Sequence, residues 1–365
     1  MICMKILLLN WKDRTHPLAG GAEVLSYNVM KRLADRGHQV TWYTSLYPGA
    51  EPESTEGGIT YLRAGTYRSI HYHARSYLKS LPNREEPNVI IDEVNTRPFD
   101  PSRFVQHQIR VINWVHQLAR EVWFYEVPFP IAVLGRYLLE DHWLRRISKH
   151  TTMALSNSTA EDLTKLNFRD VRIVPPAIDF AEYRENVSRI NPPSLLYIGR
   201  LSKGKRVEDA LKAYSLVRRK IPTSMIVLGR GPVYNNLVRR FPNVTFPGYL
   251  TESEKSRIIS QATLLLVPGT REGWGLVVLE AQARGVVPIV YNVPGLRDAV
   301  GHGKAGILLN SNTPESMADA VLDILANKER LMSMSQACRD WASHFTYERT
   351  TNMVESILLD RYVGD

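Results

Sequence analysis

Two glutamates in the second half of the chain, Glu272 and Glu280, enclose the glycine-rich run EGWGLVVLE. The apolar residues 264–266 just before it predict a buried strand, and the pattern over 276–283 predicts a helix that ends near Gly285. Backbone N–H groups at the start of such a helix attract anions. Two carboxylates beside an anion site suit a ligand with both phosphate and hydroxyl groups, such as a nucleotide-sugar. The alternative, two solvated surface charges, leaves the register of strand, turn and helix unexplained.

Two cations follow another predicted strand. Gly199-Arg200 closes the strand expected at 195–199, and Lys205 lies on the approach to the next helix. The planar fork of an Arg and the ammonium of a Lys can together neutralise a diphosphate. Lys203 is a second lysine in the same segment. The alternative is that this segment is only a basic surface cluster.

Glycines recur where the predicted strands end. Gly20-Gly21 opens a helix after the first strand, where the backbone can approach a ligand closely. Gly229 in the run GRGP ends another strand, and Gly248 repeats the pattern after the next. Backbone near Gly229 and Gly248 could cover a nucleobase, which needs flat contacts and few charges. Each of these signals is weak by itself.

His116 directly follows the buried run 111–115. A single His is usually structural or on the surface. Ligands of doubly wound sheets, however, bind beyond the carboxyl ends of the strands, so this position favours a functional role. Asp92 and Glu93 end the preceding strand and are candidates for lining the acceptor side of a site.

The chain of 365 residues predicts two domains, and 44% hydrophobic with 23% charged residues is ordinary for a globular protein. Cys3 and Cys338 lie far apart and are read as reduced thiols of a cytoplasmic protein. No run approaches the length needed to span a bilayer, and the apolar residues 6–9 are too few for a signal segment. We therefore expect a soluble protein, or one that lies at most on a membrane surface.

The net charge of +9 is uneven, because residues 1–185 hold 23 Lys and Arg against 21 Asp and Glu, while 186–365 hold 23 against 16. The basic excess lies with the paired glutamates and favours a polyanionic small ligand. A nucleic-acid binder would need a longer basic stripe with stacking aromatics, so no nucleic-acid partner is expected. The chain has no D-x-D pair and no His, Asp and Glu cluster with metal spacing. We expect no metal and no cofactor, with protein cations and a helix dipole stabilising the leaving diphosphate.

Short apolar runs alternate with longer helical patterns, and many runs are apolar throughout, as in parallel strands buried on both faces. Ser158 and Glu161 are typical of a capping box at a helix start. The strands predicted in the first half are 5–10, 39–44, 59–63, 89–92, 110–116, 152–156 and 172–174. Those predicted in the second half are 195–199, 224–228, 244–246, 264–268, 287–291 and 306–309. The expected fold class is α/β, with two doubly wound, Rossmann-like parallel sheets facing a cleft.

Domain boundaries are indicated by proline. Two proline pairs bracket a polar stretch between Pro176 and Pro192. This pattern predicts a linker there. We expect a domain over 1–180 that binds the acceptor and a domain over 181–346 that binds the donor. A helical pattern near the C-terminus predicts a last helix within 347–365.

These features resemble the retaining glycosyltransferases of family 4, which have the GT-B fold. Residues 272–280 resemble the E-x7-E motif of that family, in the context PGTREGWGLVVLEAQARGVVPIV. Gly199-Arg200 with Lys205, and the pair Gly20-Gly21, match further elements, so that the resemblance covers nearly the whole chain. The combination is specific, whereas single elements are not.

The resemblance implies transfer of a sugar from a UDP-, GDP-, ADP- or dTDP-sugar to a hydroxyl acceptor, which is a glycan, a glycolipid or a small glycoside. Glu272 would bind hydroxyls of the donor sugar and Glu280 the ribose, while Arg200 and Lys205 would hold the diphosphate. His116 would contact the donor sugar near the reacting centre. The further donor-binding candidates are Gly21, Gly199, Gly229, Gly273, Trp274, Gly275 and Leu276.

The resemblance also implies a front-face mechanism, in which the leaving phosphate oxygen takes the acceptor proton and no protein nucleophile is needed. The residues agree, since none forms a convincing nucleophile–base pair. In GT-B folds the last helix crosses back to the N-terminal domain, a role that suits 347–362.

The acceptor cannot be derived from the sequence. Residues 114–143 are rich in aromatics, and 67–84 mix apolar and basic residues, so the two segments could meet a lipid surface. The alternative is ordinary core and solvated faces, which the near-neutral charge of this half favours. Two rival functions are a sugar-nucleotide epimerase of the same fold, which would need acid and base carboxylates, and a nonenzymatic nucleic-acid binder.

Overall fold

The computed structural model describes residues 3–81, 86–179, 191–248 and 250–360. These residues divide into two compact units. As far as they are described, Met1–Arg120, Leu134–Ala177 and Tyr347–Asp365 form the first unit, and Glu121–Val133 and Ile178–Thr346 form the second. The linker expected between Pro176 and Pro192 falls largely on 180–190, outside the described residues.

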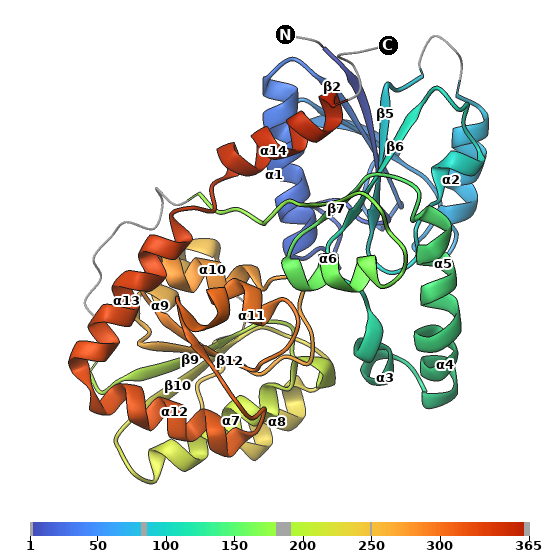
Figure 1. Cartoon of the computed structure of the whole chain (residues 1–365). Helices are drawn as coiled ribbons and strands as arrows, with labels where there is room; N and C mark the ends of the chain where they lie inside the picture. Colours follow the sequence, from blue (N-terminus) through green and yellow to red (C-terminus); the bar gives the residue numbers. More distant parts are fainter. Residues whose placement is uncertain (1–2, 82–85, 180–190, 249, 361–365) are drawn as a thin grey trace. The chain divides into compact units, whose positions relative to one another are not determined.

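The first unit is built on an eight-stranded sheet in the order β3-β4-β2-β1-β5-β6-β7-β8 (Figure 1). All its pairs are parallel except β3 with β4. The central strands β1 and β5 are largely apolar and almost wholly buried, as their composition predicts, but β5 also buries Asp92 and Glu93. The strands are β1 (Lys5–Leu9), β2 (Gln39–Thr44), β3 (Glu53–Glu56), β4 (Ile59–Arg63), β5 (Val89–Val94), β6 (Arg110–Val115), β7 (Thr152–Ala154) and β8 (Val171–Ile173).

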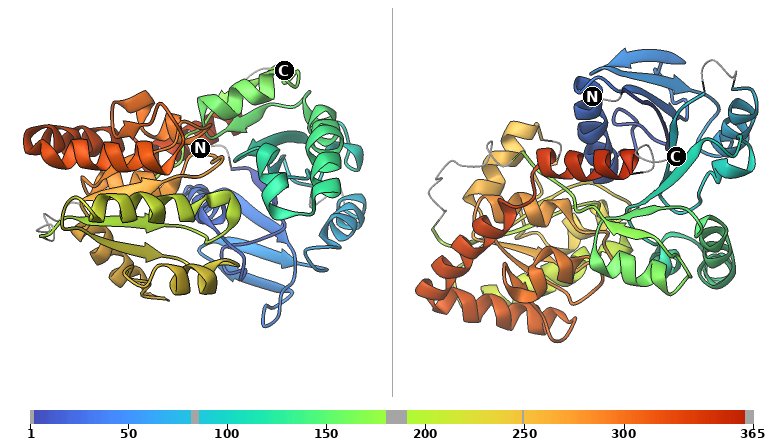
Figure 2. Two further views of the ribbon diagram at one scale, coloured as in Figure 1. Left: turned by 90° about the horizontal axis from the view of Figure 1, so that it is seen from below. Right: turned by 45° about the horizontal axis from the view of Figure 1, so that its top comes forward.

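Helices flank both faces of this sheet (Figure 1, Figure 2). The α-helices of the first unit are α1 (Gly21–Asp35), α2 (Ile70–Lys79), α5 (Glu140–Ile147), α6 (Asn157–Thr164) and α14 (Tyr347–Leu359). α4 (Phe129–Leu134), which belongs to the second unit except for its last residue, comes before α5 in the chain. A π-helical turn, η3 (Gly135–Leu139), joins α4 to α5, and a 3-10 turn, η1 (Pro101–Arg103), follows β5.

The last helix, α14, packs against α1 in the core of the first unit (Figure 1). Val354 and Leu358 are buried in the cluster that holds Leu25 and Leu33 of α1. Arg36, directly after α1, donates hydrogen bonds to Glu348 and Asn352, each 2.7 Å long. Residues from the C-terminus of the chain thus complete the unit that begins at its N-terminus.

The second unit is built on a five-stranded, wholly parallel sheet in the order β10-β9-β11-β12-β13. Its strands are β9 (Ser194–Ile198), β10 (Ser224–Leu228), β11 (Leu264–Val267), β12 (Val287–Val290) and β13 (Ile307–Leu308). Its helices are α3 (Trp123–Glu126), α7 (Val207–Arg218), α8 (Tyr234–Arg240), α9 (Glu252–Gln261), α10 (Leu276–Ala283), α11 (Leu296–Ala299), α12 (Pro314–Ala326) and α13 (Lys328–Ala342), with the 3-10 turns η5 (Lys203–Lys205) and η6 (Gly301–Gly303). One continuous hydrophobic core joins the sheet to these helices.

Three local predictions were wrong. Residues 53–56 form the antiparallel edge strand β3, which the sequence analysis did not predict. Residues 244–246 do not form a strand, because Thr245 makes only an isolated bridge to Ile226. The cap of α6 is Ser156, whose hydroxyl accepts the N–H of Thr159 at 3.1 Å, and not Ser158.

Candidate active site

In the second unit, Glu272 and Lys205 form an ion pair between two strand-end loops. Glu272 lies in the turn from β11 to α10, and Lys205 lies in η5, which follows β9. Lys205 Nζ contacts Glu272 Oε1, and the two side chains are 33% and 15% exposed. The same loops are joined where Thr270 N donates to Gly204 O at 3.0 Å. Two of the predicted site residues are therefore held together, and the lysine side chain stays partly exposed.

The other cations of this segment lie at the surface. Arg200 and Lys203 are exposed, and neither has an ion-pair partner among the described residues. Lys203 was the second candidate for the lysine of the site. Only Lys205 of the two contacts Glu272, and this contact favours Lys205. Arg200 is a fully charged group that remains available to an anion.

The glycines at the ends of β9 and β10 bring two backbones into direct contact. A Cβ on Gly229 (φ +139°) would lie 2.0 Å from Gly199 O, and one on Gly231 would lie 2.3 Å from Leu201 O. Leu201 N donates to Arg230 O at 2.9 Å, which ties the two loops together. The glycine at 229 is thus required by this backbone packing, quite apart from any ligand.

The start of α10 is set by Gly275, which precedes the helix with φ +95°. Leu276 is the first residue of the helix and is half-buried. Trp274 is buried, and its ring packs against Phe345 with centroids 5.1 Å apart. The Trp274 side chain therefore belongs to the core, so that only backbone groups around Gly273 and Trp274 remain for a ligand at this turn.

Glu280 has a partner that the sequence analysis missed. Lys255 of α9 reaches Glu280 Oε2 with its Nζ at 3.2 Å. Burial acts to lower the pKa of Lys255, but the carboxylates of Glu280 and Glu252 outweigh it and raise the pKa above its usual value. Lys255 is thus charged and positions the Glu280 carboxylate. Because Lys255 and Glu280 lie 25 positions apart in the sequence, no local pattern predicts this pair.

We predict that Lys255→Met weakens donor binding about fivefold and leaves kcat nearly unchanged, since a partly exposed ion pair contributes about 1 kcal/mol. The donor KM and the Kd of the free nucleotide measure the effect. Lys212→Met is the matched control, because Lys212 pairs with Glu208 at 3.0 Å elsewhere in the same unit. If both variants lost the same amount of donor affinity, a role for Lys255 at the site would be contradicted.

Two further side chains near Glu272 were not predicted. Tyr197 is buried in β9, and burial, followed by the nearby carboxylate of Glu272, raises the pKa of its phenol. Arg271 is also buried and donates from Nε to Glu121 Oε2 at 2.8 Å. Glu121 begins the segment Glu121–Val133, which packs with the second unit although it lies in the first half of the sequence.

In the first unit, His116 lies beside a buried carboxylate. His116 follows β6 and is 4% exposed, and its Nε2 lies 2.8 Å from Oε1 of Glu93 in β5. Ser26 of α1 donates to the same Glu93 oxygen at 3.0 Å. The imidazole also stacks on Trp114 with centroids 5.2 Å apart. Both ring nitrogens of His116 are buried and neither makes a hydrogen bond of good geometry within the described part of the chain, although Nε2 lies within ion-pair distance of Glu93.

The start of α1 agrees with the expected glycine turn. Gly20 precedes the helix, and Gly21 is its first residue. Glu23 is completely buried and accepts the N–H of Gly20 at 2.7 Å, while Lys12 Nζ lies 3.1 Å from its other oxygen. This turn is therefore held by a buried carboxylate with a cation beside it.

Asp92 has a structural role in the loop after β5. Its carboxylate accepts the backbone N–H groups of Phe99 and Asp100 at 3.1 and 2.8 Å. Burial raises the pKa of Asp92 to about 7, and these two hydrogen bonds only partly oppose the rise. The side chain thus fixes the loop after β5 and does not line a ligand site.

A raised pKa in the folded state means that Asp92 contributes stability below about pH 4, its value when unfolded, and that this contribution is lost as the pH rises towards 7. In the unmodified protein, the free energy of unfolding should therefore fall by up to about 4 kcal/mol between pH 4 and 7. We predict that Asp92→Asn, which cannot ionise, removes this fall. Melting temperatures of both proteins from pH 4 to 7 give the comparison. Parallel profiles would contradict the prediction.

The described residues contain no group of three or more His, Cys, Asp or Glu side chains placed to hold a metal ion. None of the helices within 3–81, 86–179, 191–248 and 250–360 is long and apolar enough to cross a membrane.

Comparison with solved structures identifies the fold. A sucrose-phosphate synthase from Thermosynechococcus elongatus superimposes with a TM-score of 0.79 at 17% identity, over 99% of this chain and all of that one. The Anabaena protein HepE in complex with UDP-glucose superimposes with a TM-score of 0.71 at 14% identity, over 98% of this chain and all of that one. At these identities the likeness concerns the fold, which is the GT-B glycosyltransferase fold.

Comparison of sequences identifies the family. Residues 19–182 match the family described as Glycosyltransferase Family 4, and residues 179–341 match Glycosyl transferases group 1. An N-acetyl-alpha-D-glucosaminyl L-malate synthase from Bacillus anthracis is 23% identical over 94% of this chain and 95% of its own length. The chain belongs to the GT-B glycosyltransferases of family 4 type, and it is an enzyme that transfers a sugar.

Proposed function

We propose that this enzyme transfers a hexose from a nucleotide-diphosphate sugar to a hydroxyl acceptor with retention of the anomeric configuration. The observation that carries the proposal is the ion pair of Lys205 with Glu272 between the β9 and β11 loops. It sets a partly exposed cation beside a carboxylate, as a ligand with a diphosphate next to sugar hydroxyls requires. Arg200, exposed on the same loop, adds a second cation.

In the proposed reaction, Lys205 and Arg200 bind the diphosphate and stabilise its charge as the bond to the sugar breaks. Glu272 accepts hydrogen bonds from hydroxyls of the donor sugar, and Glu280, held by Lys255, binds the ribose. A contact of His116, whose Nε2 lies 2.8 Å from Glu93 in the first unit, with the donor sugar is part of the proposal that rests on the family resemblance. The acceptor proton passes to the departing phosphate oxygen, so no protein nucleophile is required.

The donor base, the acceptor and the need for metal are part of the proposal. Binding of UDP-glucose by the Anabaena protein supports a nucleoside diphosphate-sugar donor, and UDP is the first base to test. Two cations and the N-terminus of α10 supply the positive charge for the leaving group, so we expect activity without a divalent ion. A small polar acceptor, of which L-malate in the name of the Bacillus enzyme is one kind, and a lipid-linked glycan are both candidates.

The test is thermal stabilisation by UDP, GDP, ADP and dTDP and their sugars, each with a chelator and with added Mg²⁺. A ligand bound to the native state raises the melting temperature, and a ligand at 100 times its Kd adds about 2.7 kcal/mol. We expect a shift with one base that is equal with and without Mg²⁺. NMR of the product with the donor so identified then gives its anomeric configuration. No shift with any nucleotide, or an inverted product, would overturn the proposal.

A further inference from the structure

A small hollow lies in the first unit, at the edge of the sheet where β6 and β7 begin. Its volume is about 170 Å³, and it is lined by the loop from η1 to β6, the start of β6 and the loop from α5 to β7. The lining residues that carry or can take up positive charge are His107, Arg110, Lys149 and His150. Among the described residues that line the hollow, none is an Asp or a Glu. This composition favours an anion as the ligand.

The hollow is remote from the group of this unit that is proposed to act in sugar transfer. Arg110 is the first residue of β6, whereas His116 directly follows its last residue. At about 3.3 Å per residue, the two ends of this strand are roughly 20 Å apart. Ligands of doubly wound sheets bind at the carboxyl ends of the strands, and the hollow lies at the amino ends. It is therefore a second site, separate from the one that His116 would serve.

One ring nitrogen of a lining residue is left without a partner. His150 Nε2 is buried and makes no hydrogen bond within the described part of the chain. Such an atom calls for an explanation, of which an absent ion or water is a common one. Burial, followed by the charge of Lys149, lowers the pKa of His150, although Asp100 acts in the opposite direction. An anion beside the ring would accept its N–H and favour its charged form.

The acids near the hollow are paired with arginines that do not line it. Asp170, which accepts a hydroxyl of the lining, lies 3.0 Å from Nε of Arg172. Asp100 lies 2.7 Å from Nη2 of Arg146. Lys149 is exposed and makes no ion pair with any described residue. Its charge is thus available to a ligand.

Arg110 connects the hollow to the last helix. Its Nη1 donates to the carbonyl oxygen of Leu358, near the end of α14, at 2.9 Å. Leu358 is buried in the core that α14 shares with α1. A guanidinium has five N–H donors in a fixed fork, so that it can bind an anion and hold this carbonyl at the same time. An anion in the hollow would therefore fix Arg110 and, through it, the end of α14.

We propose that this hollow binds a phosphate group, free or at the end of a small metabolite, and that the bound phosphate stabilises the end of α14. Its volume of about 170 Å³ is below the roughly 300 Å³ at which pockets for whole small ligands begin, so it suits one phosphate group and not a nucleotide. An arginine fork, an ammonium and an imidazole N–H are suitable phosphate donors. Gln106 and His107 are exposed at its border, where the rest of a metabolite would extend into solvent.

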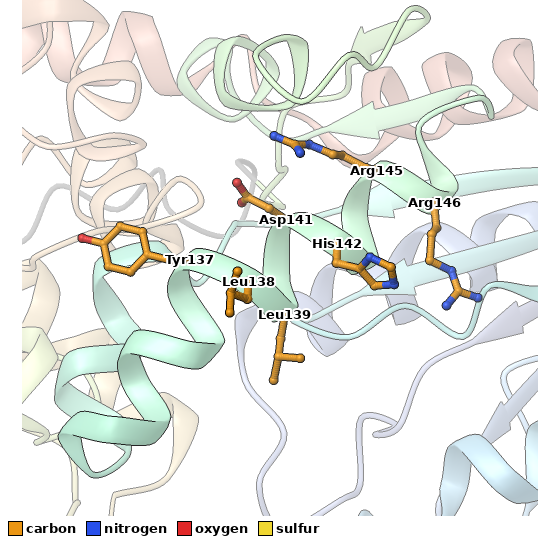
Figure 3. A pocket seen from close by; sticks show the side chains of 7 residues that line it. All are labelled: Tyr137, Leu138, Leu139, Asp141, His142, Arg145 and Arg146. Atoms are coloured by element: carbon orange, nitrogen blue, oxygen red, sulfur yellow. The ribbon is translucent and has the colours of Figure 1, made fainter.

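Binding is tested by calorimetric titration with inorganic phosphate and, in a second arm, with glucose 6-phosphate. Inorganic phosphate should bind saturably, and Lys149→Gln should raise its Kd about tenfold, because a charged hydrogen bond is lost. Arg145→Gln is the matched control and should change the Kd less than about threefold at physiological salt. Arg145 is exposed on the same helix, but Figure 3 shows it at a different hollow, of about 560 Å³, which Asp141 also lines.

The two arms identify the source of the phosphate. Tighter binding of glucose 6-phosphate would assign the hollow to a phosphorylated metabolite, and equal affinities would assign it to free phosphate. Equal losses in Lys149→Gln and Arg145→Gln would mean that a basic surface attracts anions without a site, and would overturn the proposal. So would the lack of saturable binding of either ligand up to about 10 mM.

The imidazole of His150 gives a second readout. Lys149 and Asp100 act on its charge, and Arg110 and His107 share the hollow with it. Sulfate, whose charge is constant between pH 5 and 8, should raise the pKa of His150 in an NMR titration, with His150→Gln assigning the signal. A pKa that saturating sulfate leaves unchanged would contradict the assignment of the site.

The link to α14 is tested by hydrogen exchange of residues 355–359. Phosphate at ten times its Kd should slow exchange there about tenfold, because opening of this turn then requires release of the ligand. Arg110→Gln should abolish both binding and protection. Should that variant not fold, Lys149→Gln keeps the contact of Arg110 with Leu358 and should show only about twofold protection at the same phosphate concentration. Exchange that saturating phosphate leaves unchanged would overturn the proposed link.

Discussion

Glu272→Ala is expected to lower kcat by about 10²–10³-fold while the protein stays folded. Glu272 is 15% exposed and contacts Lys205, itself 33% exposed, so water can solvate the lysine when its partner is lost. The cost to the fold should therefore be about 1 kcal/mol or less. The cost to turnover is larger, because in the proposed site the carboxylate both orients the ammonium and binds the donor sugar.

Steady-state kinetics and the melting temperature together separate these roles. Glu272→Gln should recover part of kcat, since an amide can still accept a hydrogen bond from a sugar hydroxyl but cannot pair with the lysine. Glu208→Ala is the control, as Glu208 pairs with Arg240 at 2.8 Å on α7, away from the site. If Glu272→Ala retained kcat within about threefold of the unmodified enzyme, the assignment of the site would fail.

The second large effect is expected at Gly295, which precedes α11 and packs against the backbone of the Glu272 loop. A Cβ at this position would lie 2.1 Å from the carbonyl oxygen of Glu272, and φ is +81°. Glu272 N also donates to Pro294 O at 3.2 Å, so the two loops are already in contact. Gly295→Ala should destabilise the second unit by about 3 kcal/mol or more and move Glu272 away from Lys205.

Gly303→Ala is a matched control for backbone strain, because Gly303 has φ +97° but no atom within 4 Å of its Cβ position. It should cost only about 1 kcal/mol. At about 2–4 °C per kcal/mol, the two variants should differ in melting temperature by several degrees. Only Gly295→Ala should also lose activity. Equal melting temperatures would mean that the loop yields to the methyl group at little cost.

Much of this architecture could be predicted because it depends on local patterns. Fully apolar runs predicted the buried parallel strands, and residues at strand ends predicted that Lys205 and Glu272 lie at the same edge of a sheet. The α/β class and the GT-B fold are confirmed. The residue roles proposed for the site remain predictions.

The parts that could not be predicted depend on packing between distant segments. Lys255 reaches Glu280 only because α9 packs near α10, and Glu121 reaches Arg271 across 150 positions. β3 was missed because its sequence, ESTE, is polar; three of its four residues are exposed, as is common in edge strands. Residues 244–246 were wrongly predicted as a strand, although Pro242 and Pro247 on either side limit the ladder.

The packing of α14 on α1 has a consequence for how the chain folds as it is made. The first unit lacks part of its core until Val354 and Leu358 have left the ribosome. At usual rates of synthesis, roughly ten to thirty seconds pass between the completion of residue 177 and that of α14. During this interval the groove along α1 that α14 later fills is open to water and to chaperones. The second unit is complete at Thr346, only 13 residues before the end of α14, so the half of the protein that is translated first cannot become native before the half that is translated last is nearly complete.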